Sequence, residues 1–147
     1  MPEKETVERA RQAKRKGKSP STQAGEFVHE EIEHVREGKH GARSTKQAIA
    51  IGLSKARRAG VKLPPPEKGE APKETREQAA RDLKKGAAKK KPSPARSRGA
   101  RKALKKEGRS AASKTALSRH AKSAAARRSK ADRSRAAKKA ARTRAKS

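Results

Sequence analysis

The sequence predicts a mostly α-helical protein with extensive disorder, in which a small αα-hairpin precedes a long cationic, conditionally helical tail. The first supporting observation is that Leu, Ile, Val and Phe total 13 of 147 residues, ten of them at or before Leu63. The second is that residues 72–147 hold 28 of the 44 Lys and Arg but only five of the 15 Asp and Glu. Any core must therefore lie in the first half, because the second half cannot bury enough apolar surface to offset the entropy of ordering it.

Residues 1–19 are predicted to be a charged N-terminal segment. A helix over residues 3–16 fits the sequence, but Val7 is its only large apolar residue. A helix this short is marginal by itself in water. Gly17 and Pro20 are expected to end it.

Residues 22–37 are predicted to form the first stable helix. Ser21 or Thr22 is expected to cap its start, and Gly38 follows its end, where glycine is common because it adopts the left-handed conformation readily. At 100° per residue its large apolar residues fall within about 140° of arc and form one stripe. These residues are Phe27, Val28, Ile32 and Val35.

A second helix is predicted over residues 44–59. Its start fits the S-x-x-Q capping box, with Ser44 as the cap and Gln47 three residues later. Gly60 follows two arginines, as a helix stop should. Its buried stripe is predicted to consist of Ile49, Leu53 and Ala56, with Gly52 beside it to allow close approach.

The two helices are predicted to pair as an αα-hairpin over residues 20–63. Val61 and Leu63 are expected to fold back over it, and three prolines then end the unit. The hairpin has about nine large apolar residues, whose gross burial is on the order of 20 kcal/mol, less than the cost of ordering it. We therefore expect a homo-oligomer or a protein partner at this hairpin.

Residues 64–86 are predicted to form a proline-containing linker and a solvated helix, with Glu77 and Arg81 as an ion pair. Residues 87–147 form the Lys-, Arg- and Ala-rich tail. Its alanines favour helix, but its charges repel each other in water. We therefore expect it to become helical only on a polyanion.

Nucleic acid is the polyanion that the tail is expected to bind. The tail has no aromatic residue for stacking on single strands, and no Asn or Gln for reading adenine, so Lys and Arg must contact phosphates. A Lys or Arg recurs at every eighth position from Lys90 to Lys146. Along a helix, such a series winds around the axis and favours no single face. The residues expected to bind are Lys89, Lys90, Lys91, Arg96, Arg98, Arg101, Lys102, Lys105, Lys106, Arg109, Lys114, Arg119, Lys122, Arg127, Arg128, Lys130, Arg133, Arg135, Lys138, Lys139, Arg142, Arg144 and Lys146.

Other chemistry finds little support in the sequence. Without Cys there is no disulfide and no thiolate metal site. No phosphate-binding Gly motif occurs, and so small a core cannot desolvate a catalytic site, so we expect neither enzymatic activity nor a cofactor. The longest apolar run, residues 48–53, is too short to cross a membrane, and the N-terminus lacks a hydrophobic signal core. A cytoplasmic, nucleoid-associated location is expected.

The stretch from His29 to His34 approximates the metalloprotease pattern H-E-x-x-H. Glu33 stands where that pattern needs its second His. His29, Glu33 and His34 also fall off the apolar stripe of their helix. We therefore expect a solvated acidic face and no bound metal, with a weak surface metal site as the alternative.

Two resemblances bear on function. The stretch R-S-T-K-Q-A-I-A-I-G-L-S-K-A, residues 43–56, resembles a family of small basic bacterial proteins over residues 18–63. Some members are labelled plasmid-stabilisation proteins, which implies a role in DNA maintenance. Residues 86–147 resemble the Lys/Ala-rich tail of histone H1-like bacterial proteins in composition.

These observations together predict sequence-tolerant DNA binding and compaction through the tail, in a nucleoid-associated or plasmid-maintenance role. One alternative is binding to RNA or the ribosome, because phosphate contacts do not separate DNA from RNA. Another is an adaptor role, in which the hairpin binds a protein partner and the tail only localises it.

Overall fold

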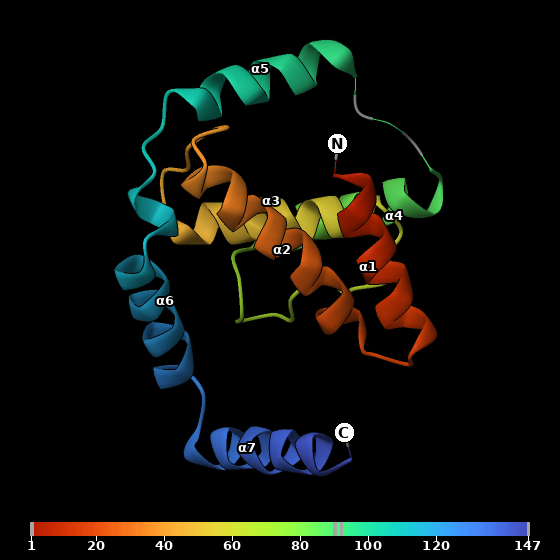
Figure 1. Ribbon diagram of the computed structural model, residues 1–147, viewed down its shortest axis with the longest axis vertical. Coiled ribbons are helices and arrows are strands. Elements are labelled where there is room, and N and C mark those ends of the chain that lie inside the picture. The colour runs from red at the N-terminus through yellow and green to blue at the C-terminus, as the bar shows by residue number, and fades with distance from the viewer. Residues whose placement is uncertain (1, 90, 92, 147) are drawn as a thin grey trace. The chain divides into compact units, whose positions relative to one another are not determined.

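The computed structural model describes residues 2–89, 91 and 93–146, and its regular structure there is helical apart from one isolated β-bridge, Lys68 to Ala71 (Figure 1). The elements are α1 (Lys4–Arg15), α2 (Pro20–Arg36), α3 (Thr45–Arg58), α4 (Lys73–Ala87), α5 (Pro94–Lys105), the 3-10 turn η1 (Ser110–Ala112), α6 (Lys114–Ala126) and α7 (Lys130–Ala145). The chain divides into two compact units, Met1–Ser113 and Lys114–Ser147.

The predicted helical class is confirmed, but the predicted extensive disorder is wrong. Helices α5, α6 and α7 occupy most of the segment expected to be disordered. Serine side chains cap two of them: Ser93 accepts from the backbone N–H of Arg96 at 3.2 Å, and Ser129 from that of Asp132 at 3.1 Å. Such caps satisfy N–H groups that a helix start leaves unpaired, and Ala, Lys and Arg favour helix strongly. These local preferences outweigh the charge repulsion on which the prediction of disorder rested.

Helices α2 and α3 lie where the two main helices were predicted. Helix α2 begins two residues earlier than predicted, because Pro20 takes its first turn. Its cap is Ser19, whose hydroxyl accepts from the backbone N–H of Thr22, and not Ser21 or Thr22 as predicted. The predicted cap of α3 is half confirmed: the Ser44 hydroxyl accepts from the N–H of Gln47 at 3.1 Å, but the Gln47 side chain accepts from the N–H of Arg43 at 2.7 Å and not from that of Ser44.

The two helices approach closely at Gly52. A Cβ atom built there would lie 2.6 Å from the Cα of Val28 on α2. The predicted role of this glycine is thus confirmed. Gly38, with φ of 77°, ends the α2 region in the left-handed conformation expected of it.

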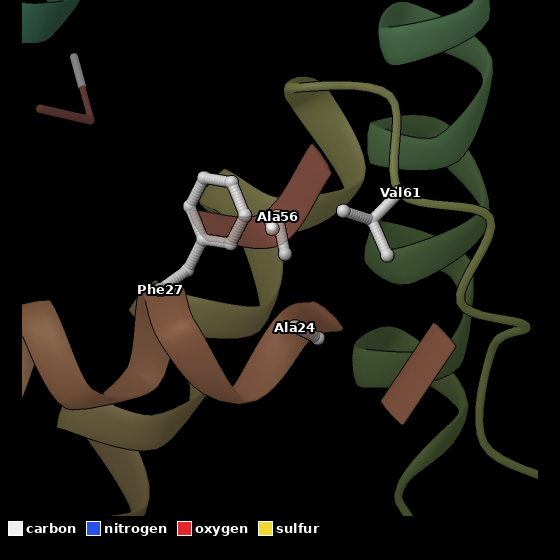
Figure 2. Close-up of a cluster of buried hydrophobic side chains, with 5 residues drawn as sticks. Ala24, Phe27, Ala56 and Val61 are labelled. Carbon is white, nitrogen blue, oxygen red and sulfur yellow. The ribbon is translucent and has the colours of Figure 1, made fainter. Parts of the chain in front are cut away.

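The core forms around Phe27, which is 1% exposed. Figure 2 shows the Phe27 ring directed toward Ala56 of α3, with Val61 on the far side of Ala56. The fold-back of Val61 is therefore confirmed. Helix α1 adds Ala10 to this cluster and packs Val7 against it, so the N-terminal segment is part of the core and is not left as an isolated, marginal helix.

Helix α4, which was predicted to be solvated, packs against α3. Asp82 is 1% exposed and accepts hydrogen bonds from Ser54 at 2.6 Å and from Arg58 at 2.9 Å. A buried carboxylate is tolerated because such partners replace water. The expectation of a fully solvated helix is wrong, and Glu77 pairs with Lys73 rather than with Arg81.

Residues 104–112 dock against the connector between α2 and α3. The Gly41 and Ala42 N–H groups donate to the carbonyls of Leu104 at 2.9 Å and Gly108 at 3.0 Å. The Thr45 hydroxyl donates to the carbonyl of Ala111 at 2.6 Å. A Cβ on Gly41 would lie 1.9 Å from a backbone oxygen of this segment. The start of the cationic region is therefore built into the first compact unit.

No helix in the described part of the chain is long and apolar enough to cross a membrane.

Candidate nucleic-acid interface

The predicted phosphate-binding side chains are accessible wherever the structure describes them. Lys90 lies outside the described residues, and each of the other predicted cations is exposed. Those in the first unit lie on the residues that follow α4, on α5 and on the turn after it. Those in the second unit lie on α6, on α7, between these helices and, in the case of Lys146, directly after α7.

Helix α5 carries most of its cations on one side. At 100° per residue, Arg98, Arg101, Lys102 and Lys105 fall within about 100° of arc, and small residues occupy most of the opposite side. No residue of α5 is buried. The helix therefore presents a continuous basic face.

Helix α7 carries cations around most of its circumference. At 100° per residue its Lys and Arg, from Lys130 to Arg144, cover about 240° of the circumference, and the remaining arc of about 120° holds Asp132, Ala136, Ala140 and Thr143. None of the residues of α7 is buried. The whole second unit holds thirteen Lys or Arg against one acidic residue, Asp132.

Asp132 neutralises few of these charges. It forms an ion pair with Arg135, and hydrogen bonding with Ser129, together with Arg135, lowers the pKa of its carboxyl group. This is the single ion pair within the described residues of the second unit. A half-exposed acid at a helix start mainly supports the helix, so most of the cations stay available to an external anion.

Arg109 differs from the other predicted cations. Its guanidinium donates to the carbonyl of Arg36 at 3.3 Å, and Arg36 in turn donates to the carbonyl of Ala112 at 2.9 Å. Arg109 therefore helps to hold the docked segment, a role that the sequence did not indicate.

A second cluster, which the sequence did not predict, lies at the end of α2. His34 was expected on a solvated face, but its side chain is 14% exposed and faces Glu30 and Glu31. His40, from the following connector, joins them. Glu30 and Glu31 precede His34 by four and three residues, the spacing that brings side chains together on a helix. That spacing was readable in the sequence, whereas the approach of His40 was not. His29, by contrast, is exposed as expected.

The comparisons with known proteins concern the first unit. Residues 3–68, which span α1, α2 and α3, match the model of a family of unknown function (DUF6496). No curated protein and no solved structure matches the chain. The cationic helices α5, α6 and α7 lie outside the matched segment, so their role must be argued from their own chemistry.

Proposed function

We propose that this protein binds double-stranded DNA with little sequence preference, in a nucleoid-associated or plasmid-maintenance role. The observation that carries the proposal is α7, an exposed helix with cations around about two-thirds of its circumference and one internal ion pair among its described residues. Lys and Arg attract phosphates through charge and release the counterions held by the duplex. With no aromatic, Asn or Gln in residues 114–147, there is little means of reading bases.

Helix shape favours a B-form duplex as the target. A helix of the length of α7 spans about 24 Å and, with side chains, about 10–12 Å across, which suits a major groove about 12 Å wide. A helix lying in that groove has a phosphate strand on either side. Cations on opposite sides, such as Arg133 and Arg142, would then reach both strands.

The same argument ranks RNA below DNA. The major groove of duplex RNA is deep and too narrow for side chains to read, and a helix cannot lie along it. Single strands are recognised largely by stacking on aromatic side chains, which this region lacks.

Ordering of the tail by DNA, expected from the sequence, is not part of the proposal, because α5, α6 and α7 are helical without a polyanion. Preformed helices pay less conformational entropy on binding. Binding then depends on charge placement alone.

Competition for a labelled DNA duplex tests the proposal. We expect a second duplex of unrelated sequence to compete within about threefold, because phosphate contacts carry no sequence information. Duplex RNA and single-stranded DNA of equal length should compete less well. Stronger competition by RNA would contradict the assignment to DNA and favour the RNA-binding alternative.

A further inference from the structure

Three side chains at the end of α2 converge on one point. Glu31, which is fully buried, and His34 both belong to α2, while His40 comes from the connector to α3. The Nε2 atom of His40 lies 3.1 Å from Oε2 of Glu31, and Nδ1 of His34 lies 3.8 Å from Oε1. The potential ligand atoms of all three lie within 4.8 Å of one another.

The outer nitrogen of each ring is already occupied. Nδ1 of His40 lies 2.9 Å from the carbonyl oxygen of Gly41, and Nε2 of His34 lies 3.1 Å from Oε1 of Glu3. Each of these oxygens accepts, so each outer nitrogen carries the hydrogen. The inner nitrogens face the Glu31 carboxylate, Nε2 of His40 at 3.1 Å, and each can donate to it only if its ring carries a second hydrogen.

Neutral rings would instead present lone pairs to this carboxylate and leave the centre short of positive charge. A metal ion bound by both imidazoles would supply it. Metal-binding histidines typically donate their other N–H to a carboxylate or a backbone carbonyl, which orients the ring and raises its basicity. Both rings have such a partner here: the Glu3 carboxylate accepts from His34, and the Gly41 carbonyl accepts from His40.

Three carboxylates surround the two rings, and in the part of the chain that the structure describes one of their oxygens has no partner. Glu31 pairs with Lys55, and Glu3 pairs with Lys39 at 3.3 Å. Glu30 is 4% exposed, and within the described residues its Oε2 has no hydrogen-bond partner. A buried carboxylate oxygen without a partner is costly and requires an explanation. Glu30 lines a cavity of about 140 Å³ together with Glu3, His34 and the cations Arg9 and Lys39, next to the cluster and not lined by Glu31 or His40.

We propose that Glu31, His34 and His40 bind one divalent transition-metal ion, with Zn²⁺ as the best fit to two imidazoles and one carboxylate. Mg²⁺ and Ca²⁺ prefer sites made wholly of oxygen. The ion would fasten the connector to α2, directly beside the backbone contacts on which residues 104–112 dock. It would therefore stabilise the first unit independently of DNA binding.

Titration of the chelator-treated full chain with ZnCl₂ tests the site. We expect one ion per chain and a rise in the thermal midpoint of about 5 °C or more at a hundredfold excess over the dissociation constant. MgCl₂ should produce no shift. Ring ¹⁵N resonances offer a readout without mutation: the signals of His34 and His40 should move, whereas those of His29 and His120 should not.

The chain supplies a matched control because it has four histidines. The double variant H34Q/H40Q should lose Zn²⁺ binding, and H29Q/H120Q should keep it. Glu3→Gln, at a half-exposed position on the outer side of His34, should weaken binding by about 10–100-fold. Unmoved His34 and His40 resonances at saturating ZnCl₂, or equal binding by both double variants, would overturn the proposal.

Discussion

A chain that ends at Ser113 is expected to bind duplex DNA at least about a hundredfold more weakly than the full chain at physiological salt. The deletion removes thirteen of the 44 Lys and Arg and the whole second unit. Affinity that comes from counterion release depends on the number of phosphates that the protein neutralises, so it falls as cations are removed. Fluorescence anisotropy with a labelled duplex measures the change.

The position of the cut matters. Ending the chain at residue 86 would also remove the docked segment, including the Ala111 carbonyl that accepts from Thr45. A loss of binding would then be confounded by a damaged first unit. The cut at Ser113 follows the boundary between the two units, so the thermal midpoint of the first unit should be unchanged. Undiminished binding by the shortened chain would refute the role assigned to α6 and α7.

Replacing Phe27 by Ala should destabilise the first unit by about 3–5 kcal/mol, the usual cost of such a truncation in a core. Phe27 is the one aromatic residue of the chain and is almost fully buried against Ala24 and Ala56. The other members of this cluster are small, so they cannot fill the space left behind. Thermal unfolding followed by circular dichroism should show the midpoint fall by more than about 10 °C.

Gly25→Ala is the matched control on the same helix. Gly25 is exposed, and a Cβ there would meet nothing within 4 Å. Alanine in a helix interior is favoured over glycine by up to about 1 kcal/mol, so this variant should be slightly more stable. If Phe27→Ala melted at the wild-type temperature, the assigned core would be wrong.

The sequence predicts the positions of α2 and α3 well because their signals are local, although of the predicted α3 stripe only Ala56 is buried and Ile49 and Leu53 are half-buried. The Ser44–Gln47 cap, the apolar stripe through Phe27 and the small Gly52 act within one or two helices. Such signals can be read without knowledge of the tertiary fold.

The remainder depends on contacts between distant residues. Asp82 is buried only because Ser54 and Arg58 meet it from α3. His40 completes the cluster at the end of α2 only because the connector turns back over Glu31. The prediction of disorder gave too much weight to total charge and too little to the serine caps and alanines of the tail.

The salt dependence of binding is the most direct test of charge-driven, sequence-tolerant recognition. For the full chain, with about 6–10 phosphates neutralised, affinity should fall roughly 10³–10⁵-fold between about 50 and 200 mM salt, equally for two unrelated duplexes. Changing the eight Lys and Arg of residues 130–146 to Gln, which retains helix propensity, should flatten this dependence. A salt-independent affinity, or one duplex bound far more tightly than the other, would contradict the account.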